Sequence, residues 1–202
     1  MSAPSRPQRA DARSNRARIL DAAEDVFGRG GASASTEDVA RLAGVGIATV
    51  FRHFPAKAEL LDAVLARRFG RLREQAEGLA ASEDPASALF DLFTAMVSDA
   101  PGKIALAEAL EEASGAADDA ASQAEQASAE LREAVGVLLR RAQEAGTVRA
   151  DVQLPELYAL LIGMSRAVTV ARLEPGVQAR ALGVVFDGLA APAPATGGAR
   201  TP

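Results

Sequence analysis

The stretch from Ser35 to Lys57, STEDVARLAGVGIATVFRHFPAK, decides the fold of this chain. Its first part predicts a short helix. Ser35 can cap the N-terminus, and Asp38 follows three residues later, as in a capping box with Asp in place of Glu. The apolar residues then recur at helical spacing and predict a buried face, made by Val39, Ala40 and Ala43.

The second part of the stretch predicts a tight turn and another short helix. Gly44 suits the turn because only glycine enters the left-handed region without steric cost. The second helix is expected from Gly46 to Phe54, and Pro55 ends it. Two short helices joined by a turn of about four residues form a helix-turn-helix, whose second helix enters the DNA major groove.

The longer run AGVGIATVFRHFPAKAELLDAV, residues 43–64, resembles the DNA-binding signature of TetR-type (TetR/AcrR) transcriptional regulators. The resemblance covers residues 13–73. It implies an all-α homodimer of about nine helices per chain. An N-terminal three-helix DNA-binding domain, with its helix-turn-helix at about 35–54, would be followed by a C-terminal helical ligand-binding and dimerisation domain.

Composition narrows the classes of function. The 202 residues include no cysteine and one histidine, which excludes disulfides and thiolate metal sites. No nucleophile elbow, P-loop or histidine metal motif occurs, so we expect no enzyme, no catalytic residue, no cofactor and no metal site. The N-terminus lacks the apolar segment of a secretory signal, and no apolar run approaches the ~20 residues of a membrane span. We therefore expect a cytoplasmic protein with no membrane partner.

The charge distribution is uneven along the chain. The formal net charge is −5, but residues 1–73 hold 13 Arg and Lys against 8 Asp and Glu, a net charge of +5. The remaining residues carry −10. A basic front and an acidic back are expected when one end meets nucleic-acid phosphates and the other does not.

The chain divides by composition into four parts. Residues 1–12 are expected to form a disordered arm, 13–73 the DNA-binding domain, 74–190 the ligand-binding and dimerisation domain, and 191–202 a disordered tail. Several arginines cluster around the end of the arm, including Arg13 and Arg16. They belong either to a solvated tail or to an arm that reaches phosphates or the minor groove.

Apolar periodicity predicts the remaining helices. The first spans about 14–29, and another begins after Pro55 and extends to about residue 80. A helix from Pro85 is expected to end at Pro101 and Gly102, with a separate helix over 104–114. Residues 115–129 are expected to form a loop and then the exposed start of a helix that ends at Gly146. Two last helices are expected over 155–172 and 176–190.

The residues predicted to bind DNA lie around the helix-turn-helix and just before it: Ser35, Thr36, Gly46, Ile47, Ala48, Thr49, Phe51, Arg52, His53 and Lys57, with Arg13 and Arg16. Ile47 and Ala48 can contact a thymine methyl group. Arg52 could make a bidentate hydrogen bond to a guanine or could contact a phosphate. The resemblance implies backbone contacts at Thr49, Phe51, His53 and Lys57.

Two residues depart from the pattern of the family that the sequence resembles. Gly46 stands where serine is common, which weakens the helix cap, and Phe51 stands where tyrosine is common, which removes a hydroxyl that reaches phosphate. His53, the sole histidine, either packs at the corner between the two helices or contacts a phosphate.

The back half predicts an effector pocket and a dimer interface. The pocket candidates are Phe93, Met96, Leu110, Tyr158 and Met164, although an ordinary core would explain the same pattern. Ala159, Gly163 and Ala167 are four residues apart and permit close helix approach. The helices over 155–172 and 176–190 are therefore expected to form a four-helix bundle with a second copy, the alternative being burial within one subunit.

The function predicted is that of a homodimeric repressor. It would bind a palindromic operator in double-stranded DNA and be released by a small, mostly apolar effector. The alternative is a small-molecule-binding protein whose DNA-binding end is vestigial. The basic front of the chain favours the regulator, and DNA binding at low salt distinguishes the two.

Overall fold

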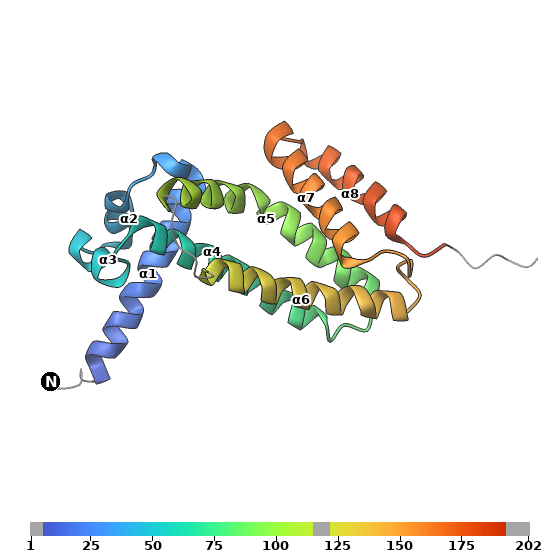
Figure 1. Cartoon of the computed structure of the whole chain (residues 1–202), viewed down its shortest axis with the longest axis horizontal. Helices are drawn as coiled ribbons and strands as arrows, with labels where there is room; N and C mark the ends of the chain where they lie inside the picture. The colour runs from blue at the N-terminus through green and yellow to red at the C-terminus, as the bar shows by residue number, and fades with distance from the viewer. Residues whose placement is uncertain (1–5, 115–121, 193–202) are drawn as a thin grey trace, which may run out of the picture. The chain divides into compact units, whose positions relative to one another are not determined.

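The computed structural model describes residues 6–114 and 122–192, which form eight α-helices and one short 3-10 turn (Figure 1). In chain order they are α1 (Arg6–Gly30), η1 (Gly31–Ser33), α2 (Thr36–Ala43), α3 (Ile47–His53), α4 (Lys57–Leu79), α5 (Pro85–Ala113), α6 (Gln123–Glu144), α7 (Leu154–Ala171) and α8 (Pro175–Leu189). The described residues contain no strand, and the predicted all-α class is confirmed. The disordered tail expected from residue 191 lies almost wholly outside them.

The chain folds into two compact units. The first comprises the chain up to Glu74 together with Ser98–Glu133, and the second comprises Gln75–Val97 and the chain from Ala134 onward. The first break follows Glu74, one residue after the predicted end of the DNA-binding domain. The predicted second domain is different, because its residues 98–133 pack with the N-terminal unit and α4, α5 and α6 each contribute to both units.

The core of the first unit joins the helix-turn-helix to α5 and α6. It contains fully buried side chains from α1, α2 and α3, including Phe27, Val39 and Val50. The same cluster continues through α4 to residues far along the chain, namely Leu60, Leu61, Val64, Leu106, Ala109 and Ala124. The buried face predicted for α2 is confirmed.

The first helix is longer than its apolar pattern predicts. It begins at Arg6, so the expected disorder of residues 1–12 and the expected start near Ser14 were wrong for residues 6–13. Pro7 lies in the first turn, where its missing N–H costs no hydrogen bond. Residues 11–14 are exposed, so the first part of α1 buries no apolar face. The apolar periodicity of the sequence therefore could not indicate that the helix begins this early.

The helix that was expected to end at Pro101 continues through it. Pro101 lies inside α5, and the two helices predicted over 85–114 are one. Proline in a helix interior costs about 3 kcal/mol. The residues on either side of it are anchored in apolar packing, since Val97, Ala100 and Leu106 are fully buried.

The start of α6 is fixed by three polar side chains. Ser122 and Glu125 form a capping box, in which the Ser122 hydroxyl accepts from Glu125 N at 3.1 Å and the Glu125 carboxylate accepts from Ser122 N at 2.9 Å. Asp62 of α4, 8% exposed, accepts from Gln123 N at 3.1 Å and Ala124 N at 3.0 Å. Helical structure therefore begins at Gln123, and residues 115–121 lie outside the described part.

The second unit holds α7 and α8 against part of α5. Phe186 of α8 stacks on Phe90, with ring centroids 4.3 Å apart, and meets the edge of Phe93 at 5.7 Å. The segment after α6 pairs with the end of α8, because Arg149 N donates to Leu189 O at 3.0 Å. These contacts hold the C-terminal part of α8 in place.

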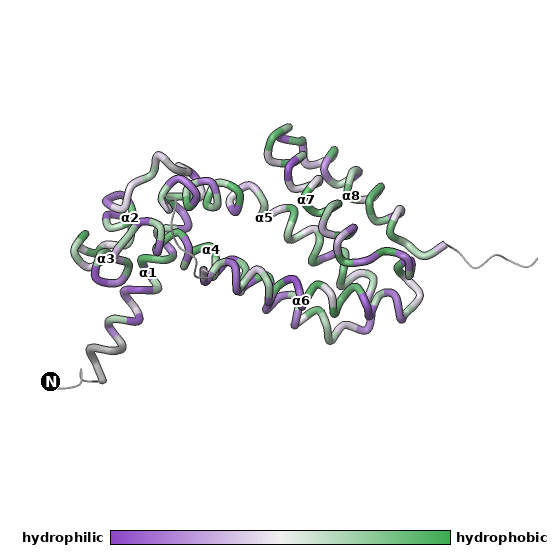
Figure 2. Tube along the Cα trace, viewed as in Figure 1, coloured by the Kyte–Doolittle hydropathy of each residue, from purple (hydrophilic) through white to green (hydrophobic). Residues whose placement is uncertain are grey.

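Helices α7 and α8 keep much of their apolar surface exposed, and hydrophobic residues recur along both (Figure 2). The exposed apolar residues include Leu160, Ile162, Val170, Val177 and Val184. By length and composition α7 could cross a membrane, with a mean hydropathy of 1.3 and only 17% of its residues buried. The expectation that no apolar run approaches a membrane span was therefore wrong for α7.

Candidate nucleic-acid interface

The cap of α2 is built as its sequence predicts, with one difference. The Ser35 hydroxyl accepts from Asp38 N at 3.1 Å and donates to Asp38 Oδ2 at 2.8 Å. The difference is that the Asp38 carboxylate bonds to the hydroxyl of Ser35, whereas in a capping box it would bond to the backbone N–H of Ser35. Hydrogen bonds from Ser35, aided by Arg41, lower the pKa of Asp38. The carboxylate therefore stays charged at neutral pH, next to the positive end of the helix dipole.

The turn between α2 and α3 depends on Gly44. Its φ of 65° and ψ of 37° place it in the left-handed region, and its N–H bonds to the carbonyls that end α2. α3 then starts at Ile47, with Gly46 as its cap residue and no side-chain cap. The absence of a capping side chain at Gly46 leaves the first N–H groups of α3 accessible to an acceptor from outside.

α3 divides into a buried face and an exposed face. Val50 and Phe54 are buried, as predicted, and hold α3 on the core. Ile47 and Phe51 are 36% and 43% exposed. The rest of the exposed surface is made by Gly46, Ala48 and Arg52. This small, largely apolar surface with one guanidinium is what α3 presents to a partner.

Lys57 has a structural role that the sequence did not reveal. Its ammonium donates to Ala34 O at 2.9 Å and lies 5.3 Å from the centre of the Phe27 ring. It thereby ties the start of α4 to the segment that precedes α2. An ammonium has three N–H donors, and the hydrogen bond to Ala34 engages one of them.

Other predicted DNA-binding residues surround the same helices. The Arg16 guanidinium lies 5.0 Å from the centre of the Phe54 ring and is otherwise exposed, as Arg13 is. His53 is half-buried, and its ring centroid is 6.5 Å from that of Phe54. This position is compatible with packing and with a phosphate contact, so both alternatives for His53 stay open. Thr36 and Thr49 are half-buried as well.

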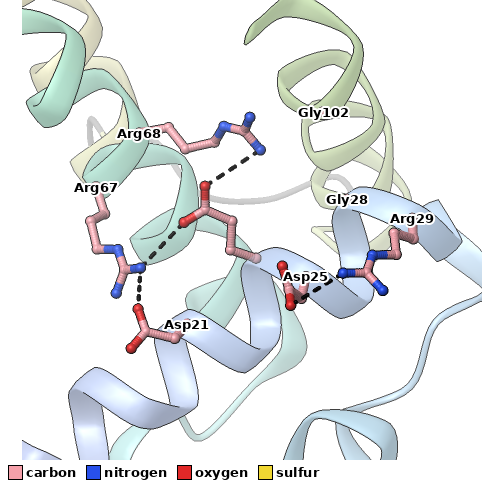
Figure 3. Close-up of a pocket in the computed structure, with 8 residues that line it drawn as sticks. Asp21, Asp25, Gly28, Arg29, Arg67, Arg68 and Gly102 are labelled. Atoms are coloured by element: carbon pink, nitrogen blue, oxygen red, sulfur yellow. Dashed lines mark hydrogen bonds and ion pairs between the residues drawn. The ribbon is translucent and has the colours of Figure 1, made fainter. Parts of the chain in front are cut away.

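A network of ion pairs joins α1 to α4 (Figure 3), and Arg68 of α4 extends it to Asp99 of α5. The carboxylate of Glu24 on α1 accepts hydrogen bonds from Arg71 at 3.0 Å and Arg67 at 3.3 Å, and it forms an ion pair with Arg68 at 3.6 Å. Arg68 also binds the carboxylate of Asp99 on α5 through its Nε, at 3.1 Å, and through Nη2. One arginine therefore connects the first helix to α5.

The network is only partly accessible to water. The side chains of Arg68, Glu24 and Asp99 are 13%, 19% and 22% exposed. Burial opposes ionisation of Glu24, but the hydrogen bond from Arg71 and the charges of the three arginines together lower the pKa of Glu24. Gly102 completes the arrangement, since a Cβ there would lie 2.7 Å from Arg68 Nη1.

Comparison with known proteins agrees with this architecture. Residues 19–64 match the model of the bacterial regulatory proteins of the tetR family, and residues 84–191 match the C-terminal domain of SbtR-like transcriptional regulators. The second match covers more than half of the chain. This chain belongs to the TetR family of transcriptional regulators.

Two solved TetR structures resemble the whole chain. A TetR regulator from Mycobacterium vanbaalenii is 38% identical, with a TM-score of 0.72, and the match covers 91% of this chain and 99% of that one. SCO0520 of Streptomyces coelicolor is 30% identical, with a TM-score of 0.73, over 88% and 99% of the two chains.

The two curated relatives match this chain over 60 residues each. The regulator SrpR of Pseudomonas putida is 50% identical over 60 residues, which is 29% of this chain and 28% of SrpR. TtgW of Pseudomonas putida is 47% identical over 60 residues, or 45% of its length. The matched stretch thus spans less than half of either relative.

The effector residues predicted for this TetR-family protein do not all meet. Phe93, Met96 and Tyr158 line one cavity in the second unit, but its volume is about 10 Å³, roughly the space of one water. Leu110 lies in the first unit at a larger groove, and Met164 is half-buried on α7. Lys103, which sequence analysis missed, also lines that groove.

Sequence analysis also missed the ion-pair network. A signal for it exists in α4, where Arg67, Arg68 and Arg71 fall within five residues with no acidic residue among them. Such a cluster requires acidic partners from other helices. Which helices supply them depends on packing, and the partners prove to be 43–47 residues earlier and 31 residues later in the chain.

Proposed function

We propose that this chain is a sequence-specific DNA-binding regulator that acts as a homodimeric repressor and responds to a small effector. The carrying observation is α3, whose exposed surface of Gly46, Ile47, Ala48, Phe51 and Arg52 belongs to a helix-turn-helix within residues 1–73, a stretch with a net charge of +5. Ile47 and Ala48 would contact thymine methyl groups, and Arg52 would contact guanine or a phosphate.

The phosphate contacts would come from around α3. Lys57, Arg13 and Arg16 supply positive charge, and the uncapped start of α3 supplies backbone N–H groups. His53 and Thr49 are within the same surface. Phe51 contributes apolar contact only, so binding would depend strongly on arginine, lysine and backbone donors.

The dimer would form through α7 and α8 of each chain. Val170 and Val184 are 76% and 72% exposed, which is unusual for large apolar side chains on adjacent helices. An isologous four-helix bundle made with a second copy would bury this surface, so the exposed apolar residues need no membrane to cover them. Each α3 of the dimer would then occupy one half-site of a palindrome, with centres about 34–36 Å apart.

Oligomeric state tests the interface directly. Ile162 of α7 and Leu42 of α2 are both 57% exposed, so they form a matched pair. Ile162→Glu should give monomers by light scattering at micromolar concentration, whereas Leu42→Glu should leave the dimer intact. A monomeric unaltered protein, or an Ile162→Glu dimer, would contradict the proposed interface.

Selection of bound duplexes from a random DNA pool tests the main proposal. An enriched palindrome is expected with purified protein at moderate salt. Lys57→Ala should weaken binding to all sequences and reduce the slope of log affinity against log salt by about 0.9, the value for one phosphate contact. Arg140→Ala removes the same charge from the exposed side of α6 and should leave that slope unchanged. Absence of DNA binding at low salt would favour the small-molecule-binding alternative.

A further inference from the structure

The first unit contains an open groove between α4, α5 and α6. Its volume is about 540 Å³, within the roughly 300–1,000 Å³ typical of small-molecule sites. Its apolar lining comes from all three helices: Leu65, Phe69, Ile104, Ala107, Leu110 and Ala129. It is therefore some fifty times larger than the cavity lined by Phe93, Met96 and Tyr158.

A single largely buried cation lies in this apolar lining. The Lys103 ammonium is 5.9 Å from the centre of the Phe69 ring, a cation–π contact. It makes no hydrogen bond and no ion pair with any residue in the described part of the chain. Burial lowers the pKa of Lys103, and the charge of Asp99 opposes that effect. An ammonium that is desolvated without an anion is unfavourable, and a bound carboxylate would relieve the cost.

The acidic groups near Lys103 are already engaged. Asp99 lies one helical turn before Lys103, and both of its carboxylate oxygens accept hydrogen bonds from Arg68. The Glu125 carboxylate at the edge of the groove accepts from Ser122 N in the capping box of α6. Arg132 adds a second positive charge to the lining. The groove lining thus combines apolar side chains with two basic residues and one acidic residue.

We propose that this groove binds an amphipathic organic carboxylate, with the carboxylate on Lys103 and the apolar chain along Phe69, Ile104 and Leu110. The inference rests on the proposed function, because it identifies the chemical class and the site of the effector. It places that site in the first unit, away from Phe93, Met96 and Tyr158.

The position of the groove offers a physical route to the DNA-binding helices. Leu65 belongs to the same buried cluster as Val39 and Val50 of the helix-turn-helix. Lys103 follows Gly102, the residue against which Arg68 packs while it bridges Glu24 and Asp99. A carboxylate bound at Lys103 would change the electrostatic potential at the bridge that Arg68 makes between Glu24 and Asp99. An effector that binds one arrangement of α1 and α4 more tightly than another would then shift the fraction of protein able to bind DNA.

Calorimetry with decanoate and decanol on the full-length protein tests the proposal, at concentrations below micelle formation. Decanoate should bind one molecule per chain at least tenfold more tightly than decanol. Lys103→Met should weaken decanoate binding at least tenfold and leave decanol unchanged. Ala129→Phe, at an exposed position of the groove, should weaken both. Circular dichroism and thermal melting verify that each variant is folded.

The chain has one other lysine, Lys57, which supplies a matched control. Lys57→Met should lose DNA affinity and keep decanoate affinity. Equal binding of decanoate and decanol, unchanged decanoate binding by folded Lys103→Met, or no decanoate binding would each overturn the inference.

DNA binding measured on the same samples separates this inference from the proposed function. Protein that binds a palindrome but not decanoate sinks the effector site alone. Protein that binds decanoate through Lys103 but no DNA sinks the proposed regulator and retains the groove.

Discussion

Removal of the Asp62 carboxylate tests how α4 holds the start of α6. Asp62 is almost wholly buried and accepts two backbone N–H groups at 3.1 and 3.0 Å. Loss of an N-terminal cap costs about 0.5–2 kcal/mol, and a buried donor left without an acceptor costs about 1–3 kcal/mol. Gln123 is exposed and water can replace one bond, but Ala124 is buried and its N–H would have no acceptor.

We therefore expect Asp62→Ala to lower the free energy of unfolding by about 2–3 kcal/mol, the sum of a moderate cap loss and one buried unpaired donor. Urea denaturation followed by circular dichroism measures this change. Asp62→Asn keeps one acceptor oxygen and should lose about half as much.

Glu59→Ala is the matched control, because it removes an exposed carboxylate three residues earlier on the same helix. Its effect should stay within about 0.5 kcal/mol, as is usual for surface substitutions. An Asp62→Ala protein with a stability within about 0.5 kcal/mol of the unaltered chain would refute the argument.

Three further predictions concern the ion-pair network, α3 and α5. Folding lowers the pKa of Glu24 below its usual value of 4.5, so its contribution to stability is complete above pH 4.5 and is lost as the pH falls below that value. Glu24→Gln should therefore make the free energy of unfolding, measured by urea denaturation, depend less on pH in this acidic range. Phe51→Tyr restores a hydroxyl on an exposed ring and should raise affinity for all DNA sequences several-fold in a fluorescence-anisotropy titration, and unchanged affinity would show that residue 51 does not reach a phosphate. Pro101→Ala should raise the free energy of unfolding by about 1–3 kcal/mol in urea denaturation, because Pro101 is exposed and only the backbone changes; destabilisation would mean that the proline is needed for packing.

The network around Glu24 explains why the first unit extends beyond the helix-turn-helix. Arg68 binds carboxylates of α1 and α5 together, and Asp62 binds the start of α6. Both residues belong to α4. Removal of one partner from a shielded ion pair is costly because the other charge remains desolvated. The DNA-binding helices are thus held by parts of the chain that the sequence alone places in the second domain.

Local signals predicted much of the candidate site. The Ser35 cap, the left-handed turn at Gly44 and the buried face of Val50 and Phe54 follow from interactions within a few residues, and the structure has each of them. The capping box of Ser122 and Glu125 was equally visible in the sequence, as Ser-x-x-Glu, and was overlooked among the alanines around it.

Local signals failed where packing across the chain overrides them. Pro101 and Gly102 are a typical helix end, yet α5 continues because Val97 and Leu106 on either side are buried and Gly102 gives room to Arg68. The exposed first turns of α1 have no apolar face, so periodicity carried no information about them.

The sequence by itself determined the all-α class, the helix-turn-helix and the basic front of this protein, because caps, turns and helical spacing act over short distances along the chain. Only the tertiary structure decided which residues share a cavity. It separated Leu110 from Phe93 and Tyr158, filled the space between the latter two, and brought Lys103 beside Phe69 in an open groove. Cavities arise where side chains from distant segments fail to fill space, and no local pattern records that.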